Sequence, residues 1–264
     1  MATTNTASNG TATEFLVPTE MKAIRYHKLK DFSLVTMPVP QPQGHGILVQ
    51  VRSARIYGMD LHIYNGDFQS ALTQGKSVVT GHETSRIVGK RRERKKGFQA
   101  RRQGHGGQFG ANCSWEEASL FEAASCAIHG LDRIRPEAGS NILLIGASPT
   151  GLCLAQLLKT NGGAPMVLAS NEVPKMELAK RLNCADEYVE LSRKDPAKQW
   201  ADLKIKYPYG FDVVVEASGS HVLLEQAIDC CTRGGKLYYG VYQKSALINV
   251  SPQRVLQDEI TMVG

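Results

Sequence analysis

The sequence NILLIGASPTGLCLAQLLKT, at residues 141–160, decides the fold. An apolar run predicts a buried strand, a glycine-containing turn follows, and a longer apolar pattern then predicts a helix. Gly146 stands at the tight turn, and Gly151 stands where the helix must pack closely against the strand. Ser148 takes the place of a middle glycine, where its side chain crowds an approaching pyrophosphate. The arrangement is typical of a loop that holds a dinucleotide, and the alternative is a strand–turn–helix unit without a ligand.

Strands and helices alternate through the remainder of the chain. Apolar patterns predict further strands at 166–170, 187–191, 211–218, 236–241 and 260–264, and helices at 174–183 and 221–231. Strands regularly separated by helices form a parallel sheet with helices on both faces. We therefore predict an α/β fold, with a doubly wound Rossmann domain over residues 141–264.

The N-terminal half has a different pattern. It holds short β-rich segments, with a strong alternating strand at 46–56, and a later helix that Ser114 and Glu117 open as a capping box. The predicted divisions are a disordered tail at 1–20, a β-rich region at 21–89, a basic irregular segment at 90–113 and a connecting helix at 114–140.

The net charge of +6 comes from one short segment. Residues 90–102, KRRERKKGFQARR, hold eight basic residues and one acid, and the remaining chain carries 23 basic and 24 acidic residues. Nucleic-acid recognition usually needs a basic face with aromatic or helical elements that read the bases. We therefore expect a solvated loop here and no nucleic-acid partner.

The cysteines and the apolar runs indicate the compartment. None of the six cysteines forms a CxxC pair, and the first residues lack the apolar core of a secretory signal. No apolar run reaches the length of a membrane span. We therefore expect reduced thiols in a cytoplasmic protein that has no membrane partner.

The end of the second predicted strand determines the cofactor. NAD-binding proteins usually place an Asp or Glu there for the ribose hydroxyls. Ser170 and Asn171 stand here instead, with Lys175 shortly after, so a 2′-phosphate is not repelled and NADP is slightly favoured over NAD. Glu172 argues for NAD, and a plain surface helix cap is the alternative. The predicted cofactor-binding residues are Gly146, Ser148, Pro149, Thr150, Gly151, Leu152, Ser170, Asn171, Lys175, Ala217, Ser218 and Gly219.

Several segments resemble one family. They include IYGMDLHIYNGDF, VTGHE, SWEEASLFEAASCAIHGLDRI, GASPTGLCLAQLLK and FDVVVEASG, and they lie in the family's order. The chain resembles the zinc-type polyol dehydrogenases of the medium-chain dehydrogenase/reductase family, most of all the fungal arabinitol dehydrogenases. The resemblance implies a β-rich GroES-like catalytic domain before the Rossmann domain, and a homo-oligomer joined at the Rossmann edge. It also implies NAD(P)-dependent interconversion of a polyol and a ketose, with zinc as Lewis acid.

The same resemblance implies a metal site and a proton relay. The family's zinc ligands correspond to Tyr57, His82, Glu83 and Glu122, so Tyr57 stands where the family has a cysteine. A phenol is a poor zinc ligand near neutral pH, which leaves a weak site of His82, Glu83 and Glu122. Met59 replaces the hydroxyl residue of the relay, and a thioether cannot carry a proton. The implied catalytic residues are Asp60, His62 and Glu122.

Two departures from the family indicate an incomplete copy. The family's four-cysteine structural zinc lobe corresponds to residues 90–113, where Cys113 is the only cysteine, and the family continues beyond Gly264. A frameshift, a faulty gene model or a decayed gene would explain both departures. The alternative function is therefore a non-catalytic, nucleotide-binding remnant of such an enzyme.

Overall fold

The computed structural model describes residues 17–43, 47–66, 77–91, 113–171, 173–240 and 247–264. The chain forms two compact units: unit 1 comprises Met1–Asp60 and Thr73–Ser119, and unit 2 comprises Leu61–Leu72 and Leu120–Gly264. Most of the predicted tail and of the basic segment lies outside the described residues. Within the described parts, no helix is long and apolar enough to cross a membrane.

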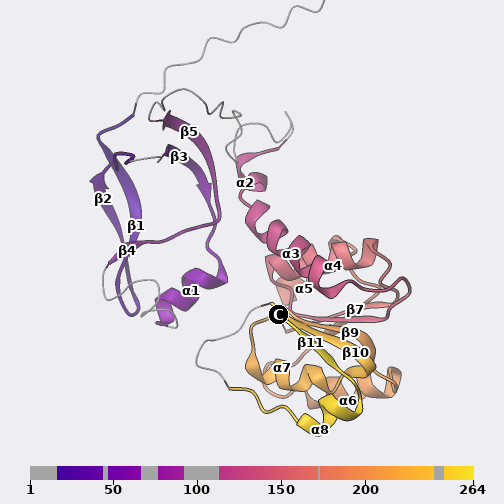
Figure 1. Cartoon of the computed structure of the whole chain (residues 1–264). Coiled ribbons are helices and arrows are strands. Elements are labelled where there is room, and N and C mark those ends of the chain that lie inside the picture. The colour runs from indigo at the N-terminus through magenta and orange to yellow at the C-terminus, as the bar shows by residue number, and fades with distance from the viewer. Residues whose placement is uncertain (1–16, 44–46, 67–76, 92–112, 172, 241–246) are drawn as a thin grey trace, which may run out of the picture. The chain divides into compact units, whose positions relative to one another are not determined.

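Unit 1 contains two antiparallel sheets (Figure 1). In the first, β1 (Glu20–Lys28) lies between β2 (Asp31–Pro38) and β4 (Val78–Val79). In the second, β3 (Ile47–Ala54) pairs with β5 (Thr84–Arg91), which extends two residues into the segment predicted to be irregular. These strands agree with the β-rich pattern of the sequence.

One helix interrupts the region predicted to be β-rich. α1 (Gly58–Asn65) begins directly after Tyr57, whose backbone N–H donates to the Asp60 carboxylate at 2.9 Å. A carboxylate in the first turn of a helix satisfies a backbone donor and interacts favourably with the helix dipole. The β-rich prediction was wrong here because Ile63 is the one buried side chain of α1, so no apolar stripe marks the helix in the sequence.

The helix predicted over 114–140 is divided in two. α2 (Trp115–Ala118) belongs to unit 1, and α3 (Phe121–Ile134) belongs to unit 2. The predicted capping box is confirmed, because Ser114 Oγ accepts the Glu117 N–H at 3.1 Å and the Glu117 carboxylate accepts the Ser114 N–H at 2.7 Å.

The predicted helix also ends early. The residue after α3, Arg135, has a left-handed backbone with φ +45°, and its N–H closes the helix on the Leu131 carbonyl. Pro136 follows, and a proline disfavours helical backbone at the residue before it. The helical pattern therefore stops short of residue 140.

Unit 2 is built around one six-stranded parallel sheet (Figure 1). Its strands lie in the order β11-β10-β9-β6-β7-β8. They are β6 (Ile142–Ile145), β7 (Met166–Ser170), β8 (Glu187–Glu190), β9 (Phe211–Glu216), β10 (Cys231–Tyr239) and β11 (Thr261–Val263). The helices between them are α4 (Pro149–Thr160), α5 (Val173–Arg181), α6 (Ala197–Lys206), α7 (His221–Ile228) and α8 (Pro252–Gln257). The predicted doubly wound Rossmann sheet is confirmed.

The sheet separates two apolar cores. Adjacent residues of β6 face opposite sides, so Leu144 packs with helices α3, α4 and α5, whereas Leu143 packs with α6 and α7. Both leucines are fully buried. Because both faces are covered, the central strand β6 is apolar throughout and β7 is apolar up to Ser170, which is the pattern that predicted a buried sheet.

The boundary between α7 and β10 differs from the prediction. The helix expected over 221–231 ends at Ile228, and Cys231 already belongs to β10. The Cys230 carbonyl accepts the Phe211 N–H at 2.8 Å, so the chain already pairs with β9 at the first of the two cysteines. Pairing with a neighbouring strand therefore overrides the local helical pattern.

Candidate functional site

The turn after β6 touches the loop after β9. The chain visits β6, β7 and β8 and then returns to the other side of β6 with β9, so these two strands form the switch point of the sheet. Gly146 has φ +108°, and a Cβ there would lie 2.7 Å from the Ser218 nitrogen and 2.9 Å from the Ala217 carbonyl carbon. Only glycine fits between these two backbones. A Cβ on Gly151 would likewise lie 2.5 Å from the Gly146 oxygen.

Ser148 caps the helix that follows the turn. Its backbone is extended, and its Oγ accepts the Gly151 N–H at 3.0 Å. The same hydroxyl donates to the Ala217 carbonyl at 3.2 Å. The sequence led us to expect that this side chain crowds an approaching pyrophosphate. In the structure its hydroxyl is hydrogen-bonded to Gly151 and to Ala217, on the two sides of the switch point.

A cavity of about 230 Å³ lies beside this turn. Of the residues predicted to bind a cofactor, six line it: Gly146, Ser148, Ser170, Asn171, Lys175 and Ser218. The other six, Pro149, Thr150, Gly151, Leu152, Ala217 and Gly219, lie within four residues of a lining residue in the chain without lining the cavity themselves. Glu172 lies outside the described residues. The structure therefore brings the turn and the end of β7 to one cavity at the carboxyl ends of the strands.

Some lining residues were missed by the sequence reasoning. They are Ile145, Ala147, Ala169, Leu191, Ser220 and Leu223. Most stand at or just beyond the carboxyl end of a predicted strand, and that position was the available signal, because parallel strands end together at one edge of the sheet.

Glu216 is a buried carboxylate at the end of β9 and was also missed. Its side chain is fully buried, and it accepts the Ser218 N–H at 2.8 Å, the Gly219 N–H at 3.1 Å and the Ser218 hydroxyl. Burial raises the pKa of this carboxyl, although these donors pull the pKa in the opposite direction. Glu216 thereby holds the loop that forms one wall of the cavity.

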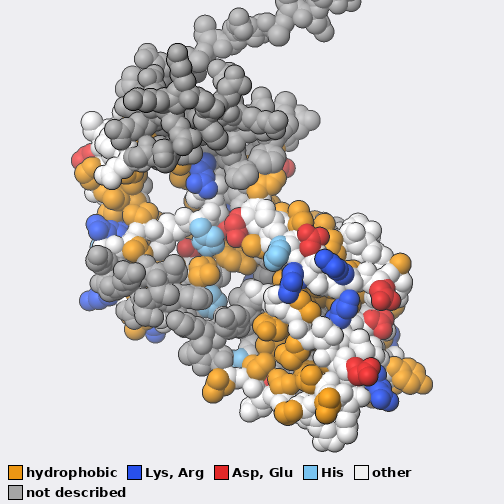
Figure 2. All heavy atoms as spheres, viewed as in Figure 1, with side chains coloured by type: hydrophobic (Ala, Val, Ile, Leu, Met, Phe, Trp, Pro, Cys, Tyr) orange, Lys and Arg blue, Asp and Glu red, His pale blue; other side chains and the backbone are white. Residues whose placement is uncertain are grey.

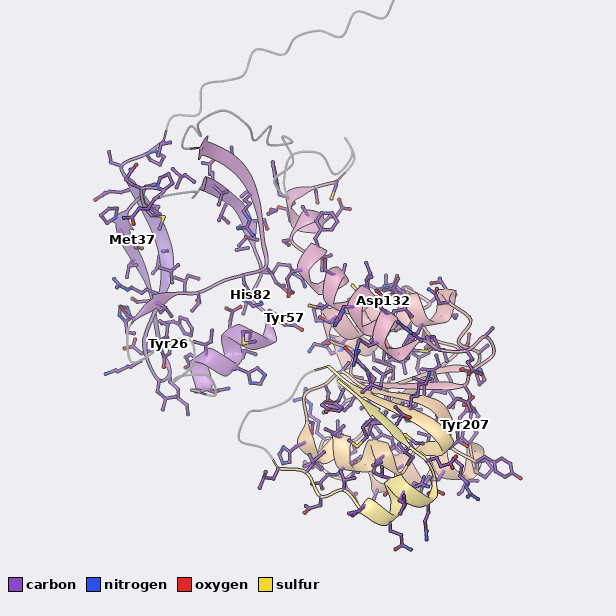
Figure 3. The ribbon with its side chains drawn as sticks, viewed as in Figure 1. Tyr26, Met37, Tyr57, His82, Asp132 and Tyr207 are labelled. Carbon is purple, nitrogen blue, oxygen red and sulfur yellow. The ribbon has the colours of Figure 1, made fainter. Side chains whose placement is uncertain are left out.

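The residues implied as metal ligands are divided between the units. In unit 1, the rings of Tyr57 and His82 meet edge-on with their centroids 6.0 Å apart (Figure 3). Glu83, next to His82, is buried, and its Oε2 lies 3.9 Å from Arg55 Nη1. In unit 2, the Glu122 carboxylate accepts the Cys126 thiol at 3.2 Å.

The donors do not fit zinc. Zinc in proteins takes thiolate, imidazole and carboxylate ligands, whereas a phenol with a pKa near 10 stays protonated at neutral pH. Arg55 already places a positive charge beside the Glu83 carboxylate, which opposes the approach of a cation. Across the described residues, no group of three or more His, Cys, Asp or Glu side chains could hold a metal ion. We derive no catalytic step through a metal.

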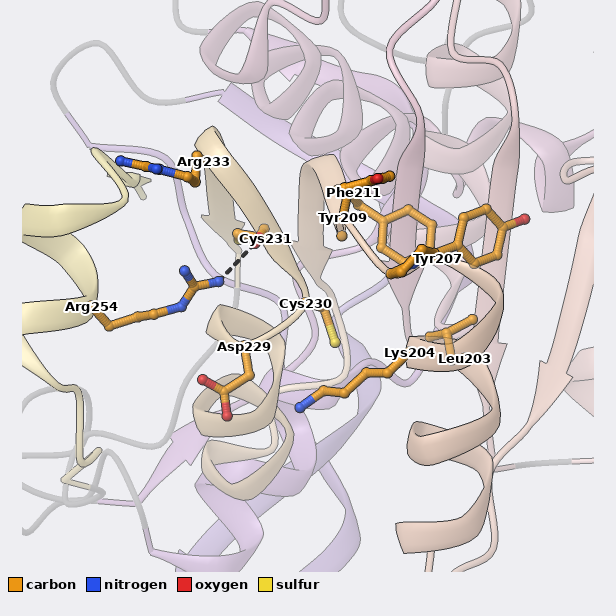
Figure 4. Close-up of a pocket in the computed structure, with 12 residues that line it drawn as sticks. Leu203, Lys204, Tyr207, Tyr209, Phe211, Asp229, Cys230, Cys231, Arg233 and Arg254 are labelled. Carbon is orange, nitrogen blue, oxygen red and sulfur yellow. Dashed lines mark hydrogen bonds between the residues drawn. The ribbon is translucent and has the colours of Figure 1, made fainter.

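A second cavity, of about 370 Å³, lies at the opposite end of the sheet of unit 2. Its lining includes Phe211 and Cys231, the first residues of β9 and β10. Arg254 donates to the Cys231 carbonyl at 2.8 Å (Figure 4) and also pairs with Asp258. The Tyr207 hydroxyl lies 2.8 Å from the Glu187 carboxylate. These hydrogen bonds and this ion pair hold parts of unit 2 together, and the cavity is separate from the switch point.

We expect the two thiols of this cavity to be unreactive in the folded protein. Burial raises the pKa of Cys230 to about 11 and that of Cys231 to about 12, and the thiolate is the reactive species. At pH 8 only about a thousandth of Cys230 is ionised. Alkylation with iodoacetamide, followed residue by residue by mass spectrometry, should modify the exposed Cys113 long before either. Equal rates in the native protein would contradict the expected burial, and in denaturant the rates should converge.

Comparisons with known proteins identify the family. A family model described as zinc-binding dehydrogenase matches residues 149–264. D-arabinitol dehydrogenase 1 of Uromyces fabae is 40% identical, over 94% of this chain and 83% of that protein. The chain belongs to the zinc-type polyol dehydrogenases of the medium-chain dehydrogenase/reductase family. Sorbitol dehydrogenase of Bacillus subtilis (strain 168) is 26% identical, over 84% of this chain and 75% of that protein.

Solved structures have the same fold as this chain. A protein of Sinorhizobium meliloti 1021 described as a zinc-binding dehydrogenase, bound to NADP, matches with a TM-score of 0.74 and 21% identity, over 93% of this chain and 84% of that one. An alcohol dehydrogenase of E. coli CFT073, in complex with NADH, matches with a TM-score of 0.75 and 18% identity, over 93% of this chain and 83% of that one. The predicted resemblance and fold class are confirmed.

Proposed function

We propose that the chain binds a nicotinamide dinucleotide at the switch point and oxidises a sugar alcohol of the arabinitol type to a ketose. This proposal rests on the close approach of Gly146 to the Ala217–Ser218 peptide, beside a cavity at the carboxyl ends of the strands. The 40% identity to a D-arabinitol dehydrogenase supports the substrate class.

The residues around the cavity fit a dinucleotide. The glycine turn and the first turn of α4 would hold the pyrophosphate, because a helix N-terminus presents a positive dipole end to an anion. Ser170, Asn171 and Lys175 would hold the ribose end, and Ser218 would form the opposite wall. When bound, the dinucleotide would supply the hydride acceptor for oxidation of the alcohol. We propose NADP as the slightly favoured cofactor.

Replacing Lys175 with glutamate should separate the two cofactors. The lysine lines the cavity, and a carboxylate in its place would repel the 2′-phosphate that only NADP carries. We expect the dissociation constant for NADPH to rise about tenfold or more and that for NADH to change little. Lys198→Glu, an exposed charge reversal on α6 away from the cavity, is the matched control. Equal weakening of both cofactors would count against a 2′-phosphate contact at Lys175.

The substrate half of the proposal rests on family membership. Asp60, His62 and Glu122 are our proposed catalytic side chains, although no group of three or more His, Cys, Asp or Glu among the described residues could hold a metal ion. The comparisons do not favour the second function, and its one support is that Tyr57 and Met59 occupy the positions at which the resemblance implies a metal ligand and a relay hydroxyl. In that case the chain binds the dinucleotide without turning over a polyol.

Two further proposals concern the oligomeric state of the protein and its location in the cell. As implied by the family resemblance, we propose a homo-oligomer in which subunits join at the sheet edge formed by β11. On the visible face of unit 2, Lys and Arg side chains lie among Asp and Glu side chains (Figure 2). We propose the cytoplasm as its location.

One experiment separates the two functions. The dialysed full-length chain is assayed for zinc content and for reduction of NADP and NAD in the presence of D-arabinitol, xylitol and sorbitol. Polyol-dependent reduction supports the dehydrogenase. Dinucleotide binding without reduction, by protein that is folded by circular dichroism, would establish the non-catalytic function instead.

A further inference from the structure

Two positions in the first turn of α4, residues 149 and 151, present no free N–H to an anion. A helix normally leaves its first N–H groups without intrahelical partners, and these groups bind phosphates. Here Pro149 is the first helical residue and has no N–H. The Gly151 N–H is already bonded to Ser148 Oγ at 3.0 Å. The helix therefore caps itself with its own side chain at the point where the pyrophosphate is proposed to bind.

The same hydroxyl fixes the turn in shape. Ser148 Oγ also donates to the Ala217 carbonyl at 3.2 Å, which belongs to the loop after β9. A Cβ placed on Gly151 would lie 3.2 Å from this Oγ and 3.4 Å from the Ala217 side chain, so the three residues meet at one junction. Ser148 thus links the loops on the two sides of the switch point.

We infer that Ser148 sets the dinucleotide affinity of this site: its hydroxyl stabilises the ligand-free turn and withholds the Gly151 N–H from the pyrophosphate. This inference rests on the proposed function. It has two consequences of opposite sign, since removing the hydroxyl should make the protein less stable and the dinucleotide bind more tightly. A residue with a purely structural role would move stability alone or would weaken binding.

Two substitutions separate the hydroxyl from the Cβ. Ser148 lines the cavity; Ser148→Ala removes its hydroxyl and keeps its Cβ, whereas Ser148→Gly removes both. For Ser148→Ala we expect Tm to fall by about 2 to 4 °C, because an N-cap hydroxyl is lost. The dissociation constant for NADPH should fall about three- to tenfold, because one more backbone donor becomes accessible. Ser148→Gly should bind at least as tightly with a smaller loss of Tm, because glycine is tolerated at N-caps.

The chain offers a matched control in Ser251→Ala. Ser251 caps α8, is also followed by a proline, and accepts the Arg254 N–H at 3.3 Å, but it does not line the cavity. This variant should lower Tm and leave the NADPH dissociation constant unchanged. The measurements are calorimetric titration of the full chain with NADPH and with NADH, and thermal unfolding of each variant.

The outcomes are distinct. Tighter binding by Ser148→Ala, with lower Tm, supports the inference. Unchanged or weaker binding by Ser148→Ala, while the wild type binds, overturns it and leaves the proposed function intact. If Ser148→Gly alone binds more tightly, the Cβ limits the affinity and the hydroxyl does not, which also overturns it. If neither the wild type nor either variant binds a dinucleotide at millimolar concentration, the proposed function fails and the inference fails with it.

Discussion

Replacing Gly146 with alanine is expected to abolish dinucleotide binding and to lower the free energy of unfolding by about 3 kcal/mol. The added Cβ would lie 2.7 Å from a backbone nitrogen and 2.9 Å from a backbone carbon, neither of which can rotate away. The backbone at φ +108° adds strain for any residue with a side chain. To admit the Cβ, the turn and the loop after β9 must separate, and the cavity between them would change shape.

Gly139→Ala is the control that separates backbone strain from steric collision of the added Cβ. Gly139 also has a left-handed backbone, with φ +86°, but a Cβ there would meet no atom within 4 Å. It should lose only the strain, about 1 to 2 kcal/mol, and keep its affinity for NADPH. The affinities come from calorimetric titration, and the stabilities come from urea unfolding. If Gly146→Ala binds NADPH as well as Gly139→Ala does, the turn is not where the dinucleotide sits.

Replacing Phe211 with alanine should cost about 3 to 5 kcal/mol of stability. Phe211 begins β9, its side chain is almost fully buried, and its ring stacks at a tilt on Tyr207 with the centroids 4.6 Å apart. It belongs to the core between the sheet and helices α6 and α7. Its removal leaves a cavity that the surrounding strands cannot close, because they are held in register on both sides.

The control for this prediction lies two residues earlier. Tyr209 also lines the larger cavity but is 88% exposed, so Tyr209→Ala should change the stability by less than about 0.5 kcal/mol. Urea unfolding can be followed through Trp200, which is buried in the same core as Phe211. The only other tryptophan, Trp115, lies in unit 1 and can be replaced by phenylalanine in all variants. Equal losses for the two aromatic residues would contradict the described core.

Local signals predicted the centre of unit 2 well. The apolar run, the glycine turn and the proline at the helix start mark β6 and α4, whose bounds agree with the sequence pattern. The prediction failed where a residue far away in the sequence determines where an element ends. α7 ends before Cys230 and Cys231 because the Cys230 carbonyl accepts the N–H of Phe211. Phe211 lies before α7 in the chain, so this partner is not visible in the local sequence. The division between α2 and α3 falls at a boundary between units, which periodicity does not mark.

The candidate site shows the same limit. The glycine spacing indicated the turn, but the contact that explains Gly146 is made with Ser218, far away in the sequence. Ser148 was interpreted from its neighbours as a steric obstacle, and its bond to the Ala217 carbonyl could not be read from the turn alone. Glu216 looks anomalous in an apolar strand, and its role becomes visible only once the loop that it holds is placed.

The central claim is that unit 2 holds a nicotinamide dinucleotide at the switch point between β6 and β9. Its most direct test is a calorimetric titration of the dialysed full-length protein with NADPH and NADH, with Gly146→Ala measured in parallel. The account predicts saturable binding of one dinucleotide per chain by the wild type and loss of that binding in the variant. Absence of binding by the folded wild type at millimolar NADPH and NADH, or equal binding by Gly146→Ala, would contradict it.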